Sequence, residues 1–188
     1  MINNETKKSL EELIQEGLRS YPPALLALRE FCNEIRKRAE NVFRKKEEAL
    51  LKAMGCATFK ECPLWVYPDL ISPMDWDGKW AWVAVHVWAG YLSCYFGLTF
   101  WKEDTVSDLC SYVTVMMNPG NHPRRDRILK ESRNLSINLS CDNPSNEISV
   151  DLPIRPTDSE SFEKKLGETI DVWIKFWTEI GGIEKLKD

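Results

Sequence analysis

Residues 79–102, which read KWAWVAVHVWAGYLSCYFGLTFWK, decide the fold. Two runs in which residue types alternate flank Ala89 and Gly90, and this pattern is typical of a β-hairpin. If Ala89 and Gly90 form a two-residue turn, His86 faces Ser93 across the hairpin, and the same register continues to both ends. The stretch therefore predicts two antiparallel strands joined by a tight turn.

The alternation also sorts the side chains of this hairpin into two kinds. Successive residues of a strand point to opposite sides of the sheet, so one face is aliphatic and the other is aromatic with polar tips. On the predicted register Gly97 lies opposite Trp82 and leaves room for the indole ring. The predicted aromatic face consists of Trp80, Trp82, His86, Trp88, Tyr91 and Tyr95, and Trp101 extends it.

Helical spacing appears on both sides of the hairpin. The apolar residues at 10, 13, 14 and 18 predict a first helix, which Tyr21-Pro22-Pro23 interrupts. A stripe of apolar residues from Leu28 to Ala53 predicts a second, longer helix. Near the other end, a cluster of capping residues at 157–161 precedes a helical stripe that ends at Gly181-Gly182.

Three further strands are expected between the hairpin and the last helix. Residues 110–117 form one, residues 118–127 form a loop, and residues 135–141 and 148–154 alternate as a second hairpin with one apolar and one polar face. The fold class is therefore α+β, with two N-terminal helices, an antiparallel meander sheet of about five strands and a C-terminal helix. The length of 188 residues suits a single domain over 1–188.

Composition excludes several classes of protein. The net charge of -4 argues against a general nucleic-acid coat. No apolar run approaches the roughly 20 residues of a membrane span, so we expect no membrane segment. The 6 Cys have no metal-ligand spacing and predict buried free thiols in a reducing, cytoplasmic environment. In the predicted register Cys94 and His86 lie on opposite faces, which excludes a Cys–His pair.

The predicted aromatic face is the main candidate site. Such a surface suits stacking on a base, a nucleotide, a sugar or an aromatic anchor of a peptide. His86 in its centre supplies a hydrogen-bonding group that titrates near neutrality. The alternative is that the last helix, which contains Trp173, Phe176 and Trp177, covers this face and makes it a second core.

Two further patterns offer other chemistry. Pro68-Asp69 followed by Asp77-Gly78-Lys79 resembles, over these few residues, the motif of PD-(D/E)XK nucleases, in which two carboxylates hold a metal. The other interpretation of Asp77-Gly78-Lys79 is an ordinary hairpin turn. The predicted loop also gathers Arg124, Arg125 and Arg127, which suit phosphates or an acidic partner if they are not simply solvated.

We therefore expect a non-enzymatic binding or interaction module that presents its aromatic face to a protein partner or to a small aromatic or nucleotide-like ligand. No catalytic residue and no cofactor is assigned. The alternatives are a metal-dependent, nucleic-acid-processing protein that uses Asp69, Asp77 and Lys79, and a subunit that self-associates or joins a larger assembly through the aromatic face.

Overall fold

The structure is a computed structural model that describes residues 4–56, 58, 60–61, 80–102, 109–141, 146–155 and 161–186. The chain divides into two compact units, Met1–Glu34 and Ile35–Asp188. The sheet, the C-terminal helix and residues 35–54 of the long N-terminal helix belong to the second unit, and residues 4–34 of that helix belong to the first.

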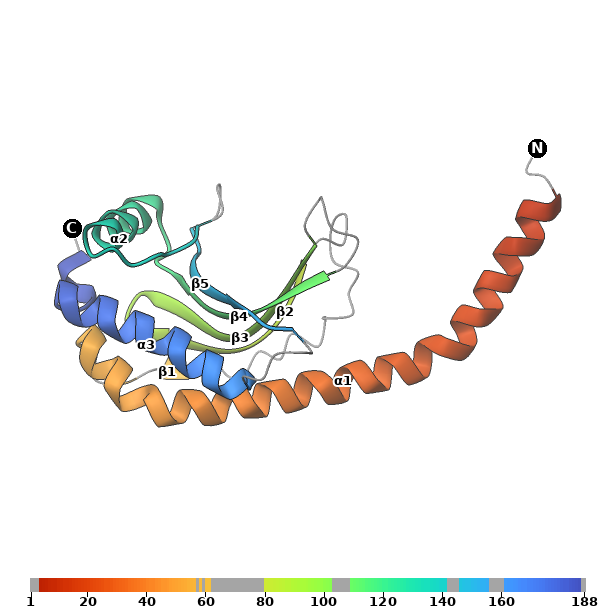
Figure 1. Ribbon diagram of the computed structural model, residues 1–188, viewed down its shortest axis with the longest axis horizontal. Coiled ribbons are helices and arrows are strands. Elements are labelled where there is room, and N and C mark those ends of the chain that lie inside the picture. Colours follow the sequence, from red (N-terminus) through yellow and green to blue (C-terminus); the bar gives the residue numbers. More distant parts are fainter. Residues whose placement is uncertain are drawn as a thin grey trace. The chain divides into compact units, whose positions relative to one another are not determined.

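The architecture is α+β, and in chain order an antiparallel sheet follows the N-terminal helix and precedes the C-terminal helix (Figure 1). The strands pair in chain order, and four strands of six residues or more carry the sheet, while β1 adds two residues at its edge. The elements are α1 (Asn4–Met54), β1 (Lys60–Glu61), β2 (Trp80–Ala89), β3 (Leu92–Lys102), β4 (Leu109–Asn118), α2 (His122–Asn134), β5 (Ile148–Pro153), α3 (Phe162–Ile180) and a 3-10 helix (Ile183–Leu186).

The predicted hairpin exists, but its turn lies one residue later than expected. Ala89 pairs with Leu92, so Gly90 and Tyr91 form the turn, and Gly90 has the positive φ of 60° that such a turn requires. The strand partners shift by two positions, and His86 faces Tyr95. A shift of two keeps each strand residue on its predicted face, so the division into two faces is confirmed for the described side chains of β2 and β3, whereas Tyr91 moves into the turn.

The N-terminal region forms one helix where two were expected. α1 runs from Asn4 to Met54 with Pro22 and Pro23 inside it. A proline removes one helical hydrogen bond and leaves a carbonyl group unpaired. Both prolines are exposed, so water can satisfy those carbonyl groups and the helix continues.

Two predictions between β4 and β5 are wrong. Part of the expected loop at 118–127 belongs to α2, because Asn121 caps a helix there and its Oδ1 accepts a hydrogen bond of 3.0 Å from the Arg124 N–H. The expected strand at 135–141 is reduced to a single bridge between Ser140 and Ser149. Its alternation instead reflects a half-buried, irregular segment in which Ile137 is buried.

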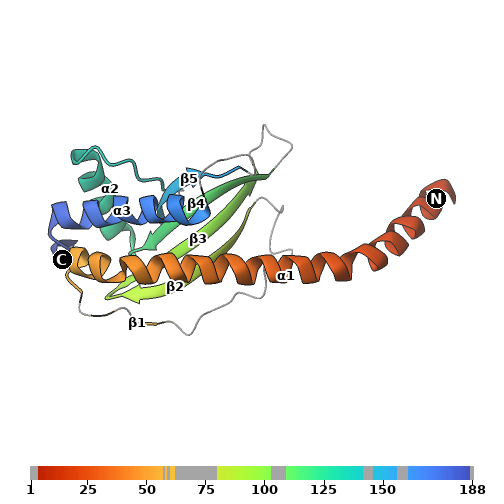
Figure 2. The ribbon, with the colours of Figure 1, turned by 60° about the horizontal axis from the view of Figure 1, so that its bottom comes forward.

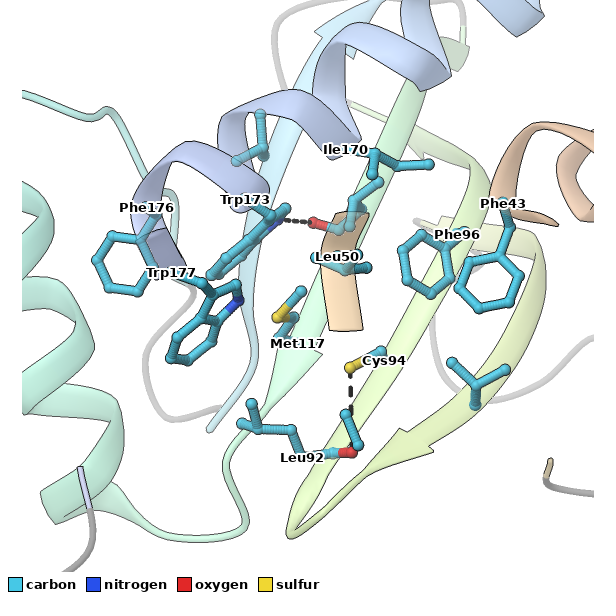
Figure 3. Close-up of a cluster of buried hydrophobic side chains, with 14 of the residues drawn as sticks. Phe43, Leu50, Leu92, Cys94, Phe96, Met117, Ile170, Trp173, Phe176 and Trp177 are labelled. Atoms are coloured by element: carbon cyan, nitrogen blue, oxygen red, sulfur yellow. Dashed lines mark hydrogen bonds between the residues drawn. The ribbon is translucent and has the colours of Figure 1, made fainter. Parts of the chain in front are cut away.

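The hydrophobic core lies on the aliphatic face of the sheet. Residues 35–54 of α1 and the whole of α3 lie side by side over this face (Figure 2). The rings of Phe43 and Phe96 are 4.8 Å apart, and the Trp173 indole donates a 3.1 Å hydrogen bond to the Val115 carbonyl (Figure 3). The alternative in which α3 covers the aromatic face is therefore wrong.

The ends of α3 confirm the predicted capping signals. The Ser161 side chain accepts a hydrogen bond from the Lys164 N–H, and Gly181 ends the helix with a φ of 81°. Within the described part of the chain, no helix is both long enough and apolar enough to cross a membrane.

Candidate functional site

The side of the sheet away from the core carries rings, hydroxyl groups and one carboxylate. We call this side the aromatic face and define it by the alternate residues of β2 to β5. With described side chains they are Ala84, His86, Trp88, Ser93, Tyr95, Gly97, Thr99, Tyr112, Thr114, Met116, Asn118, Ser149, Asp151 and Pro153. By the backbone pairing, Trp80, Trp82 and Trp101 occupy strand positions of this same face. Their side chains lie outside the described residues.

Three rings form a cluster near the turn end of β2 and β3. His86 and Tyr95 stack with their centroids 4.2 Å apart and their planes within 10°. The ring of Trp88 lies 5.7 Å from His86 at a tilt of 46°. Trp88 is 38% exposed, whereas Trp173, Phe176 and Trp177 of α3 are fully buried. The indole of Trp88 is therefore accessible to solvent beside the stacked rings of His86 and Tyr95.

His86 is tied into this cluster by a hydrogen bond as well as by stacking. Its Nε2 lies 2.6 Å from the Ser93 hydroxyl, which is almost fully buried. Burial lowers the pKa of His86 below the usual 6.5, because the low-polarity surroundings disfavour the imidazolium. The lowered pKa favours the neutral imidazole at pH 7.

The lowered pKa predicts a specific dependence of stability on pH. Protonation of His86 is easier in the unfolded chain, so its contribution is present above pH 6.5 and is lost as the pH falls through the lower folded pKa. We expect the difference in melting temperature between pH 7.5 and pH 5 to shrink in His86→Gln. In His122→Gln, which changes the exposed second histidine, the difference should persist. An unchanged pH response in His86→Gln would contradict the assignment.

A second cluster on the same face is built from hydroxyl groups and a carboxylate. Thr114 Oγ1 donates to Asp151 Oδ1 at 2.7 Å, and Ser149 Oγ donates to Asp151 Oδ2 at 2.5 Å. The Thr99 hydroxyl is hydrogen-bonded to the Thr114 hydroxyl and so extends this hydrogen-bond network to β3. Each carboxylate oxygen has two lone pairs, so both oxygens can accept a further hydrogen bond from a ligand.

The two clusters are close enough for one small ligand to span them. Tyr95 faces Met116 across β3 and β4, and Met116 faces Ser149 across β4 and β5. Neighbouring strands lie about 4.8 Å apart, so the ring cluster and the Asp151 cluster are separated by roughly 10 Å. Asp151 was not predicted as a site residue, although Ser149 and Asp151 alternate with apolar residues in the last strand.

Tyr91 does not belong to the aromatic face. As a turn residue it donates its hydroxyl hydrogen to the Ile183 carbonyl at 2.9 Å, and the guanidinium of Arg124 lies 4.1 Å above its ring. Arg127 donates to the Leu186 carbonyl at 3.2 Å, and Arg125 bonds to Asp126 at 2.8 Å. The three predicted arginines therefore contact three different groups of the chain itself.

The remaining predicted chemistry has a mixed outcome. Asp69, Asp77 and Lys79 lie outside the described residues, and no described group of His, Cys, Asp and Glu side chains could hold a metal ion. The four cysteines with described side chains are thiols rather than disulfides, but only Cys94 is buried, so the prediction of buried thiols is wrong for the other three. Burial raises the pKa of Cys94, which lies on the core face, away from His86.

Comparisons with protein-family models, with curated proteins and with solved structures find no match to this chain. The class of protein that the geometry defines is therefore an α+β domain with helices on one face of an antiparallel sheet and a ring-bearing polar surface on the other.

Proposed function

We propose that the protein is a binding module whose aromatic face takes a small ligand with a flat aromatic ring and a hydrogen-bond donor, of the kind that a nucleotide provides. The observation that carries this proposal is the half-exposed Trp88 beside the stacked pair of His86 and Tyr95. These rings are not part of the hydrophobic core, which is formed by the opposite face of the same strands.

The ring cluster supports stacking as the source of affinity. Every nucleobase has a flat π-face, and stacking on an aromatic side chain contributes about 1–3 kcal/mol per base. Ser93 fixes the imidazole orientation through the 2.6 Å contact, which limits the entropy lost when a ligand stacks.

The Asp151 cluster supports a preference for ligands that donate hydrogen bonds. Its carboxylate is held by Thr114 and Ser149 and faces the same side as the rings. A ribose hydroxyl or an amine placed roughly 10 Å from the stacked ring could reach it. The carboxylate would repel a phosphate, so the sugar rather than the phosphate of a nucleotide should lie towards β5.

The test is calorimetric titration of the full chain with adenosine, AMP, ATP and GTP. Trp88→Ala should weaken binding by about 5-fold to 150-fold, because one stacking contact is lost. Asp151→Asn and the native chain are also titrated with adenine, and the substitution should weaken the binding of adenosine more than that of adenine, because only adenosine has the ribose hydroxyls. Leu26→Ala is the matched control, since Leu26 is 61% exposed and lies on α1.

Two outcomes would contradict the proposal. Equal binding by the native chain and by Trp88→Ala would show that the rings are not the site. Absence of heat with all four compounds would reject a nucleotide-like ligand. The alternative occupant of the aromatic face is a protein partner that inserts an aromatic side chain. In that case Trp88→Ala should lose the binding of this partner.

A further inference from the structure

The hydroxyl groups around Asp151 all direct their hydrogens the same way along the network. A carboxylate only accepts hydrogen bonds, so Thr114 donates its single hydroxyl hydrogen to Asp151 Oδ1. Thr99 is hydrogen-bonded to the same Thr114 oxygen, which has no second hydrogen to give. Thr99 is therefore the donor to Thr114, and Ser149 donates its own hydrogen to Asp151 Oδ2.

This Asp151 cluster consequently presents hydroxyl and carboxylate acceptors to a ligand, because its hydroxyl hydrogens are already used. The lone pairs that remain are those of both Asp151 oxygens, of Ser149 Oγ and of Thr99 Oγ1. A ligand hydroxyl can donate only one hydrogen here, and its own lone pairs then lie among other oxygens. An ammonium group, which has three donors and no acceptor, matches the cluster better.

Charge on the aromatic face favours a cation at the same place. Among the described residues of this face, Asp151 is the only acidic one, and none is a lysine or an arginine. Within the described part of the chain, Asp151 takes part in no ion pair. Asp151 is half-buried, so water screens its charge less than that of an exposed carboxylate. Charge-assisted hydrogen bonds are also roughly twice as strong as neutral ones.

One nitrogen atom can reach more than one of these acceptors. Thr99 Oγ1 and Asp151 Oδ1 are both hydrogen-bonded to Thr114 Oγ1. Hydrogen bonds between oxygens are about 2.8 Å long, so the two outer oxygens are no more than roughly 5.6 Å apart. A nitrogen with N–H···O bonds of about 2.9 Å can therefore lie between them. A compact ammonium with rotatable donors suits acceptors from two strands, whereas a planar guanidinium suits the two oxygens of one carboxylate.

We propose that the ligand of the aromatic face carries a primary ammonium group, which binds at the Asp151 cluster while its flat ring stacks beside Trp88. This inference rests on the ring-binding function proposed above and narrows the ligand to a cationic one, such as an aminonucleoside. The separation of roughly 10 Å between the two clusters leaves room for a stacked ring, a sugar and one hydrogen bond. An anionic group at the same end of the ligand is repelled by Asp151.

The test is calorimetric titration of the full chain at pH 7 with a matched series of nucleosides. The series is adenosine, 5′-amino-5′-deoxyadenosine, whose amine is protonated, and AMP, which carries a phosphate at the same position. The ammonium compound should bind about 10-fold or more tighter than adenosine, because hydrogen bonds between charged groups are stronger than neutral ones. AMP should bind more weakly than adenosine.

Three substitutions locate the effect. Asp151→Asn keeps the shape of the side chain and should remove the preference for the ammonium compound over adenosine. Thr99→Val deletes only the outer hydroxyl and should reduce this preference. Asp126→Asn is the matched control, since it removes an exposed carboxylate of α2 and should leave the preference unaltered.

The opposite results separate this inference from the function on which it rests. If adenosine binds and the ammonium compound binds no tighter, the selection of a cation is overturned and the ring-binding function stands. If the preference persists in Asp151→Asn, the ammonium group binds elsewhere and its assignment to Asp151 is overturned. Absence of binding by all three compounds would overturn both the ammonium site and the ring-binding function.

Discussion

Replacing Trp173 by Ala is expected to lower the free energy of unfolding by about 3–5 kcal/mol, as full truncation of a buried aromatic residue does. Trp173 is completely buried in α3, stacks on Trp177 at 6.1 Å and meets the edge of Phe176 at 5.8 Å. Its indole N–H also binds the Val115 carbonyl, which joins the helix to the middle of β4. Urea denaturation followed by circular dichroism measures the loss.

Lys175→Ala is the control for this prediction, because Lys175 is an exposed residue of the same helix. A substitution there should change the stability by no more than about 0.5 kcal/mol. Trp173→Phe should fall between the two, since it retains most of the ring but loses the hydrogen bond. A loss of under about 1 kcal/mol in Trp173→Ala would contradict the core described here.

Gly97→Ala is expected to cost about 3 kcal/mol or more, because it forces two strands apart. A Cβ at Gly97 would approach backbone atoms of β2, lying 2.6 Å from the Ala84 Cα and 2.8 Å from the Val83 carbonyl carbon. These atoms belong to the strand ladder and cannot move aside as a flexible side chain could. The same urea experiment measures the cost, and nucleotide titration should show weaker binding at the displaced rings.

Gly17→Ala provides the matched control for the glycine substitution. Gly17 lies in α1 with no other group within 4 Å of the added Cβ, and alanine favours a helix more than glycine does by roughly 0.5–1 kcal/mol. We therefore expect opposite signs for the two substitutions. If Gly97→Ala were as harmless as Gly17→Ala, the close approach of β2 and β3 would be incorrect.

The faces of the hairpin were predictable from sequence because strand alternation has a period of two. The turn was not, because Ala89-Gly90 and Gly90-Tyr91 both place a glycine in the turn, and local pattern does not choose between them. The structure also gives Gly97 a different role from the predicted one. It lies opposite Ala84, and its role is the close contact of the two backbones rather than room for Trp82.

Other features depended on contacts between distant parts of the chain. The helix α2 was missed because it is highly polar and buries only Ile128 and Ser132, so its apolar periodicity is weak. Tyr91 was placed on the aromatic face because its partner, Ile183, lies 92 residues away. In the candidate site, the rings of β2 and β3 were predictable from alternation, whereas the bonds to Asp151 depend on the pairing of β4 with β5.

The bond between Tyr91 and Ile183 has a mechanical consequence for the sheet. This hydrogen bond links the turn of the β2–β3 hairpin to the 3-10 helix at Ile183–Leu186. The guanidinium of Arg124, in α2, lies over the same tyrosine ring. One end of the hairpin is therefore anchored from two sides. Any bending of β2 and β3 around an arriving ligand must pivot about this anchor, with the largest displacement at the opposite end of the two strands.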